Sequence, residues 1–378
     1  MKKRFSILTL IICVIFSSVF SIIGYNFLKP QSNLEEKISE INSIVLNNFD
    51  GTIDAEKLED EVLTAYVSAL GDKYSSYISL ENSSSYNNNL KGEGEGFGIE
   101  VFKNKNGYMQ VNTVYENSSA DKSGIKSNDV IIKIDEQNVT AKNYNELYNY
   151  ITNKNKGDIV KFTIIRDNKT INIEVTKDYF VKQTIFYEVI DNLGYIKITH
   201  FTSTSVESFN LAINSLLAKN VKALIFDVRS NSGGTVDSVS KMLDSLLPEC
   251  DIISVKYKNA TEKVLHKSDA KEINLPMAVL VNEQTASASE LFAASLREIK
   301  NSKIFGKTTY GKGKMQTIFN LKVGSLLKLT VASFYSPNKN NWDSVGIKPD
   351  FEIDSDIGYY VDAKSDPVVT SAIKYLNK

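Results

Sequence analysis

The sequence is poor in the two residue types that most often supply metal ligands and covalent cross-links. Its 378 residues include only two cysteines and two histidines. Because Cys13 lies in an apolar N-terminal run, Cys250 is the only thiol in the rest of the chain, which excludes an intramolecular disulfide framework and a cysteine metal cluster there. His200 and His266 are the only imidazoles, so the scarcity of histidine also narrows the choice of catalytic base.

The charge of the chain has no excess of either sign. There are 44 Lys and Arg residues against 45 Asp and Glu residues, which gives a net charge of −1. Nucleic-acid binding requires a basic surface that displaces counterions, so we expect no nucleic-acid partner. The hydrophobic fraction of 42% and the length together predict two or three domains with sizeable cores.

The N-terminus has the pattern of a membrane segment. Lys2, Lys3 and Arg4 precede a run at residues 5–28 that contains no charged side chain. Such a helix spans roughly 30 Å of hydrocarbon, and its basic flank stays in the cytoplasm. We therefore predict a cytoplasmic tip and transmembrane anchor at residues 1–29 of a single-pass bacterial membrane protein, with the rest extracytoplasmic. The alternative is a cleaved signal peptide, which makes the protein secreted.

Residues 34–90 are predicted as a helical region followed by a linker. One apolar stripe repeats at steps of three and four, as a helix face requires, and is made of Leu34, Ile38, Ile41, Val45 and Phe49. A second helix is expected to begin at the N-cap Asp54 and to end at Gly71. Such stripes are typical of packing or dimerisation surfaces, so a homodimer is expected. Residues 78–96, rich in Ser, Asn, Gly and Glu, are predicted as a linker.

Residues 91–177 are predicted as a compact β-rich module, with five short strand-like runs and one helix at residues 144–151. Gly96, Phe97, Gly98 and Ile99 lie where the linker meets the first strand. Glycines there let backbone N–H groups converge on an anion, and the following strand can pair with an extended peptide. From residue 178 to 378 strands alternate with amphipathic stretches, which indicates an α/β domain with a layered sheet.

A candidate nucleophile lies in this α/β domain. Ser287 follows the strand at residues 277–281 through a turn of small residues and precedes an amphipathic helix. An amide at the helix N-terminus can stabilise a developing oxyanion. The alternative is that this serine is an ordinary helix cap.

A serine nucleophile needs a base, and neither histidine lies in a suitable motif. A lysine serves if burial lowers its pKa. Lys312 is flanked by glycines, which let the backbone pack closely, and in an extended segment Gln316 would share its face. Lys307 and Lys314 remain open as rivals on spacing alone.

Three motifs resemble those of the C-terminal processing, or tail-specific, serine peptidases. Residues 227–234 read Asp-Val-Arg-Ser-Asn-Ser-Gly-Gly, residues 285–290 read Thr-Ala-Ser-Ala-Ser-Glu, and residues 310–316 read Tyr-Gly-Lys-Gly-Lys-Met-Gln. Residues 119–134 resemble the signature of a PDZ domain, and residues 71–75 and 346–350 resemble further landmarks of the peptidase family.

The resemblance implies a crotonase-like layered protease core (α+β) with an inserted PDZ domain, and a fixed set of roles. Ser287 is then the nucleophile, Lys312 the base and Gln316 its orienting partner. The amides of Gly233 and Ala288 form the oxyanion hole. The loop of Gly96, Phe97, Gly98 and Ile99 binds the terminal carboxylate of a substrate tail.

The same resemblance implies that proteins with accessible C-terminal tails are the substrates and that no metal or cofactor is required. Ser232 stands where the family has Pro, which implies a less preformed oxyanion hole. Lys73 also departs from the family pattern.

Two functions from other classes compete with this prediction. Residues 306–313 nearly match a phosphate-binding loop, but Gly313 stands where a hydroxyl must reach the metal ion. A catalytically silent PDZ scaffold is the other alternative, and Ser287→Ala distinguishes it from an enzyme.

Overall fold

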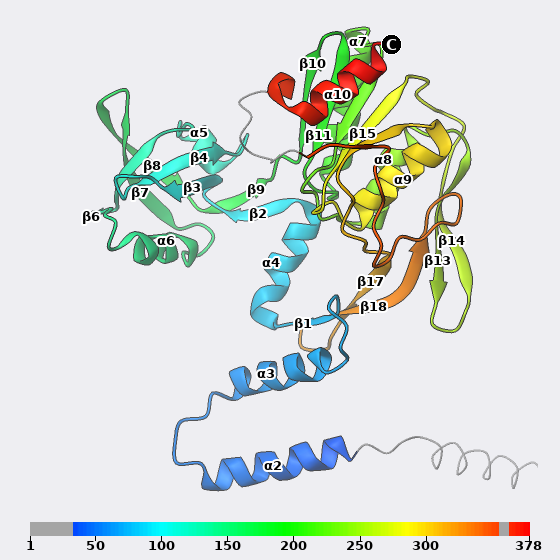
Figure 1. Cartoon of the computed structure of the whole chain (residues 1–378). Coiled ribbons are helices and arrows are strands. Elements are labelled where there is room, and N and C mark those ends of the chain that lie inside the picture. The colour runs from blue at the N-terminus through cyan, green and yellow to red at the C-terminus, as the bar shows by residue number, and fades with distance from the viewer. Residues whose placement is uncertain (1–32, 355–362) are drawn as a thin grey trace, which may run out of the picture. The chain divides into compact units, whose positions relative to one another are not determined.

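A computed structural model describes residues 33–354 and 363–378 of the chain (Figure 1). The predicted membrane anchor at residues 1–29 lies outside the described residues. No helix among the residues that the structure does describe combines the length and the apolar character needed to cross a membrane. The chain divides into two compact units that meet between Glu61 and Val62, and each is described by itself.

The first unit contains α2 (Leu34–Asn48) and the beginning of α3 (Ala55–Ser68), which confirms the two predicted helices. Asp54 caps α3, because its Oδ1 accepts a hydrogen bond from the amide of Lys57 at 3.0 Å. The apolar stripe of α2 is formed as expected, yet none of the residues of this helix is buried.

The predicted linker at residues 78–96 is wrong, because most of it is folded. It contains the end of β1 (Ser76–Ile78), α4 (Leu80–Lys91) and β2 (Glu93–Gly96). Ser79 caps the start of α4, and Gly92, with φ of 85°, ends it. Ser and Asn favour turns in isolation, but caps at both ends and packing override that preference.

The β-rich module at residues 91–177 has the predicted architecture. Its sheet has the order β3 (Ile99–Lys103), β4 (Met109–Val114), β5 (Val130–Ile134), β7 (Ile159–Arg166) and β8 (Lys169–Thr176), with β6 (Gln137–Asn138) paired to β5. Two helices, α5 (Ser119–Lys122) and α6 (Tyr144–Thr152), accompany it. The chain enters through β2 and leaves through β9 (Asp178–Val181), which pair antiparallel.

The α/β domain that follows β9 is built on a six-stranded sheet that is parallel except at one edge. Its order is β10 (Ile185–Ile190), β11 (Leu193–Ile198), β12 (Leu224–Asp227), β15 (Met277–Val281), β16 (Lys303–Gly306) and β19 (Phe351–Glu352). Every residue of β12 and β15 is buried, as expected for central parallel strands covered on both faces.

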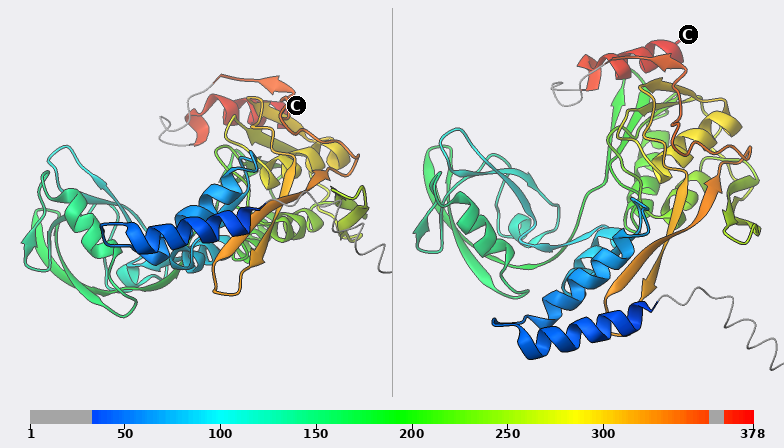
Figure 2. Two further views of the ribbon diagram at one scale, coloured as in Figure 1. Left: turned by 90° about the horizontal axis from the view of Figure 1, so that it is seen from below. Right: turned by 60° about the horizontal axis from the view of Figure 1, so that its bottom comes forward.

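Helices and a second sheet complete the layers of this domain (Figure 1). One face of the sheet packs on α7 (Ser205–Ala218), α8 (Val236–Asp244) and α9 (Ala288–Lys300), and the other on α10 (Pro367–Leu376) beside the short 3₁₀ turn Ala363–Ser365. The second sheet contains β1, β13 (Cys250–Tyr257), β14 (Glu262–Ser268), β17 (Lys314–Asn320) and β18 (Leu326–Tyr335). Figure 2 shows the β17–β18 hairpin extending from this core, where β18 pairs with β1. The layered α/β prediction is confirmed.

Candidate active site

The three motif segments leave the carboxyl ends of three neighbouring parallel strands. In the sheet β12 lies beside β15, with Asp227 opposite Leu280, and β15 lies beside β16, with Val281 opposite Gly306. Ligand sites of parallel sheets form at this edge, because the loops that follow the strands converge there. The end of β16 lies so close to β15 that glycine is required at position 306, since a Cβ there would lie 2.0 Å from the carbonyl oxygen of Val281.

Ser287 has a strained backbone between β15 and α9. Its φ of 58° and ψ of −116° lie outside the regions that L-residues favour. An ordinary N-cap residue has an extended backbone instead, and strain of this kind persists mainly at functional sites. Among the described residues, the adjacent Ala288 amide has no hydrogen-bond partner. A hydroxyl and a free amide therefore lie together at the N-terminus of α9, where the helix dipole favours negative charge.

A buried carboxylate, that of Glu290, connects the serine segment to the lysine segment. Its Oε2 accepts hydrogen bonds from the amides of Ser287 at 2.8 Å and Lys312 at 2.9 Å. Its Oε1 accepts from the amide of Gly311 at 2.7 Å and from Thr309 Oγ1 at 2.5 Å. The role of Glu290 was not predicted from the sequence, although Ser287 and Glu290 have the Ser-x-x-Glu spacing of a capping box.

Lys312 and Ser287 line one cavity of about 380 Å³. Burial and, after it, the positive charge of Lys328 lower the pKa of Lys312 below its ordinary value. Its Nζ lies 4.9 Å from the centre of the Tyr74 ring and makes no hydrogen bond within the described part of the chain, including to Ser287 Oγ. Catalytic hydrogen bonds are often long in unliganded enzymes, so the arrangement is compatible with a base that awaits substrate.

Each of the two rival lysines forms an ion pair with at least one carboxylate. Lys307 pairs with Glu283 at 3.1 Å and with Asp354 at 2.6 Å, and these carboxylates raise the pKa of Lys307. Lys314 lines the cavity but lies 3.6 Å from a carboxylate oxygen of Asp343. Of the three candidates, Lys312 is the one whose surroundings favour a neutral amine.

Gln316 lines the same cavity as Lys312. Its Nε2 donates to the carbonyl of Lys314 at 3.1 Å and to Thr330 Oγ1 at 3.2 Å, which fixes the carboxamide on the β17–β18 hairpin. Since β17 begins only at Lys314, strand alternation alone does not place Lys312 and Gln316 on one face. The orienting role of Gln316 stays a prediction.

The loop after β12 lies against the nucleophile, but one of its amides is engaged. A Cβ on Gly233, whose φ is 114°, would lie 3.0 Å from the Cβ of Ser287. The Gly233 amide donates to Oδ1 of the fully buried Asn231 at 2.9 Å, and the carbonyl of Asn231 accepts from the Ala286 amide at 3.0 Å. Gly233 must therefore release Asn231 before it can bind an oxyanion, and its role stays a prediction.

Two cavity residues come from a segment that was predicted as a linker. Tyr86 and Leu90 of α4 line the cavity beside Ser287. Neither His200 nor His266 lines it. Within residues 33–354 and 363–378 no cluster of three or more His, Cys, Asp or Glu side chains could hold a metal ion.

The phosphate-binding-loop interpretation of residues 306–313 is contradicted by the local structure. Such a loop opens a helix, whereas here the segment runs into the strand β17.

A second cavity, of about 740 Å³, lies in the β-rich module. Gly96, Phe97, Gly98 and Ile99 all line it, so the structure brings the predicted loop to a pocket. Gly98 has φ of 83°, and a Cβ there would lie 2.1 Å from the Cβ of Ser118, so this turn requires glycine. The contact of the four loop residues with the terminal carboxylate of a substrate stays a prediction.

Lys177 also lines this second cavity, and the sequence analysis missed it. Only 6% of the residue is exposed. Its Nζ donates to the carbonyls of Thr152 at 2.8 Å and Lys154 at 2.5 Å, and lies 3.7 Å from a carboxylate oxygen of Glu95. The Lys177 amine thus connects the end of α6 to β2, which leads into the loop from Gly96 to Ile99.

Comparison with known proteins identifies related sequences for both domains. Residues 192–353 match peptidase family S41, and residues 96–176 match the PDZ domain. The carboxy-terminal processing protease CtpA of Bacillus subtilis is 32% identical over 332 residues, which are 87% of this chain and 71% of CtpA. A protein of Staphylococcus aureus strain COL described as a CtpA-like serine protease is 28% identical over 366 residues, or 93% of this chain and 73% of that protein.

Solved structures support the fold. A Bacteroides fragilis protein described as an S41 protease has a TM-score of 0.57 at 16% identity, covering 87% of this chain and 92% of its own. The photosystem II D1 C-terminal processing protease has a TM-score of 0.50 at 22% identity, covering 83% of this chain and 86% of its own. The family match and the relationship to CtpA show that the chain belongs to peptidase family S41, the family of carboxy-terminal processing serine proteases, and carries a PDZ domain.

Proposed function

We propose that this protease cleaves polypeptide tails through Ser287 and Lys312, after its PDZ domain has bound the substrate C-terminus. One observation carries the proposal. The strained Ser287 and a lysine with a lowered pKa line a single cavity, and Glu290 fixes the backbone of both. A serine protease needs this pairing of nucleophile and neutral base.

In the acylation step neutral Lys312 accepts the proton of Ser287 Oγ while this oxygen attacks the scissile carbonyl carbon. The carbonyl oxygen becomes an oxyanion, which the free Ala288 amide binds first. Gly233 adds a second hydrogen bond once its amide leaves Asn231. When the C–N bond breaks, Lys312 returns the proton to the leaving amine, and an acyl-enzyme remains.

In the deacylation step a water molecule replaces the departed amine. Lys312 accepts a proton from this water as its oxygen attacks the ester carbonyl, and then protonates Ser287 Oγ as the ester bond breaks. The products are a shortened polypeptide with a new carboxylate and the free enzyme. Gln316, fixed on the β17–β18 hairpin, holds the cavity wall beside Lys312 during both steps.

The PDZ pocket supplies the preference for chain ends. The loop from Gly96 to Ile99 offers backbone amides to a terminal carboxylate, and Phe97 and Ile99 contribute apolar surface for the last side chain. Glu95 and Glu100 at the same pocket favour tails without acidic side chains near the end.

Ser287→Ala tests the proposed function. The variant should lose cleavage of a tail peptide while it keeps binding that peptide, and substrates trapped on it are identified by mass spectrometry. Ser289→Ala is the matched control, since this serine lies two residues after Ser287, within α9, and its buried Oγ has no hydrogen-bond partner in the described structure. Equal turnover in Ser287→Ala and wild type would show that the assignment is wrong.

We also propose that residues 5–28 anchor the protease in a bacterial membrane with its catalytic domain on the outer side, and that it forms a homodimer. The basic start and the apolar run support the anchor, and the exposed stripe of α2 supports the dimer. Membrane fractionation with external protease digestion tests the first. Sedimentation of the chain before and after Ile41→Glu tests the second.

A further inference from the structure

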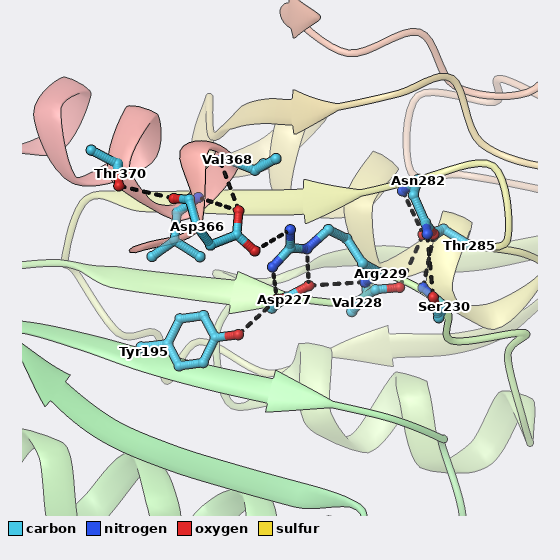
Figure 3. Close-up of polar contacts among 11 residues, drawn as sticks. Tyr195, Asp227, Val228, Arg229, Ser230, Asn282, Thr285, Asp366, Val368 and Thr370 are labelled. Atoms are coloured by element: carbon cyan, nitrogen blue, oxygen red, sulfur yellow. Dashed lines mark hydrogen bonds and ion pairs between the residues drawn. The ribbon is translucent and has the colours of Figure 1, made fainter. Parts of the chain in front are cut away.

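Asp227, Arg229 and Asp366 form a buried ionic cluster between the end of β12 and the start of α10 (Figure 3). Arg229 forms two hydrogen bonds to Asp227, from Nε at 2.9 Å and from Nη2 at 2.6 Å. Its Nη1 lies 2.7 Å from Oδ2 of Asp366. No side chain of the three is more than 8% exposed, so their charges interact with little screening by water.

The contact between Arg229 and Asp366 depends mainly on charge. Although the two atoms are close, Nη1 of Arg229 makes no aligned hydrogen bond within the described structure. Asp366 uses its other oxygen to cap α10, because Oδ1 accepts from the amide of Val368 at 2.8 Å. The carboxylate therefore joins the C-terminal helix to the guanidinium, as Figure 3 shows.

The cluster is continuous with the catalytic loops. Asp227 Oδ1 accepts a hydrogen bond from the backbone amide of Arg229 at 3.0 Å, which sets the start of the loop that carries Gly233. The next amide, that of Ser230, donates at 2.8 Å to Asn282 at the start of the serine segment. A displaced Arg229 side chain would therefore shift the backbone of residues 229 and 230, which leads to Gly233, the predicted oxyanion donor.

We propose that Asp366 is a positioning residue of the protease reaction, which holds Arg229, and through it the start of the loop from residue 229 to Gly233, in the place from which the Gly233 amide turns from Asn231 to the oxyanion. The C-terminal helix thereby becomes part of the catalytic machinery although none of its residues lines the active-site cavity. The inference rests on the proposed function of Ser287 and Gly233. It assigns to α10 a role in the chemical step rather than in substrate binding.

Asp366→Asn is the variant to measure, because Asn caps helices as well as Asp and removes only the charge. Loss of one oxyanion donor lowers kcat by roughly 10²–10³, so a displaced donor should lower kcat by about tenfold with KM unchanged. Rates are expressed per active site, from a burst titration, so that an unfolded fraction does not count. Asp366→Glu, which restores the charge, should recover much of the loss.

A second readout separates positioning from a merely structural effect. A peptide aldehyde adds to Ser287 and forms a hemiacetal whose oxygen occupies the oxyanion hole, whereas a product peptide places no oxyanion there. In Asp366→Asn the inhibition constant of the aldehyde should rise as kcat falls, while that of the product peptide stays constant. Thr370→Val is the control, since it removes a hydrogen bond of 2.9 Å to the Asp366 carbonyl in the same turn and leaves the carboxylate in place.

Two ratios test the positioning role of Asp366: kcat relative to wild type, and the change in the inhibition constant of the aldehyde relative to that of the product peptide. A kcat for Asp366→Asn within twofold of wild type, or equal weakening of aldehyde and product peptide, would overturn the positioning role. If the Asn variant does not fold, Asp366→Ser, which also retains a capping oxygen, is judged by the same two ratios. Failure of the proposed function is recognised separately, because Ser287→Ala would then cleave as wild type does.

Discussion

Lys177 and Lys312 line different cavities, and they differ in what surrounds the side-chain amine. Lys177 in the PDZ pocket is 6% exposed and contacts two carbonyl oxygens and the carboxylate of Glu95. Lys312 in the protease cavity is only half-buried, yet its Nζ has no oxygen partner within the described residues. The more deeply buried lysine thus has three oxygen neighbours, and the less buried one has none in the part of the chain that the structure describes.

The comparison shows that a catalytic lysine depends on missing acceptors as much as on burial. Burial lowers the pKa of Lys312, and oxygen acceptors of the kind that surround Lys177 would stabilise the charged form and offset that effect. Positive neighbours act in the same sense as the missing acceptors, and Lys328 is the neighbour that further lowers the pKa of Lys312.

The largest expected effect is that of Lys312→Met, which keeps the length of the side chain and removes the amine. We expect kcat to fall by about 10⁴-fold, because no proton acceptor remains for Ser287, while tail-peptide binding is retained. Steady-state cleavage with fluorescence binding of the same peptide measures both. Lys307→Gln, at an ion-paired lysine outside the cavity, is the control and should stay within twofold of wild type.

Turnover in Lys312→Met comparable to wild type would exclude Lys312 as the base. In that case Lys314→Met, at another lysine of the cavity, becomes the decisive variant.

Much of the site could be predicted from the sequence because it lies in short motifs that follow buried strands. Ser287, Lys312 and the glycine-rich turns were found in this way. Glu290 was seen only as the end of a motif, because its partners at Thr309 and Gly311 belong to another segment.

The remainder depended on contacts between segments distant in the chain. Asp366 contacts Arg229 from a distant segment of the chain, and α4 forms from a sequence that locally favours turns. Local propensity and periodicity predict neither the contact of Asp366 with Arg229 nor the formation of α4, because tertiary packing determines both of these features.

The next largest effect is expected from Asn231→Ala. This variant tests the same contrast, between a group with a hydrogen-bond partner and one without, on two backbone amides. The Ala288 amide is free in the described structure, whereas Asn231 engages that of Gly233 and also donates to the carbonyl of Ile198 at 2.9 Å. Asn231→Ala removes both contacts, so the loop loses its geometry and kcat should fall by about 10²-fold.

The KM for a tail peptide should change little in Asn231→Ala, as single-turnover acylation and steady-state rates will show. A rise in kcat would instead mean that the Asn231 contact restrains the enzyme and that the freed amide is sufficient.

A smaller effect, in a different kinetic constant, is expected from Lys177→Met. Removing the ammonium leaves the carbonyls of Thr152 and Lys154 without their donor and loosens the pocket loop. We expect KM for a tail peptide to rise about tenfold at constant kcat. A peptide with an amidated C-terminus is the control, since its weak cleavage should be the same in wild type and variant. An equal fall in kcat would place Lys177 in the chemical step and remove the contrast with Lys312.

The smallest effect is a shift in pH dependence caused by Lys328. The neutral form of Lys312 is the active base, so kcat/KM should rise with pH through a pKa that lies below the ordinary value of 10.5. Lys328→Gln removes a positive charge that disfavours protonation of Lys312, which raises that pKa and moves the rising limb of the profile to higher pH. Activity should therefore fall at neutral pH and match wild type at pH values above both pKa values. A limb that stays in place, or moves to lower pH, would show that the base is a group outside the field of Lys328.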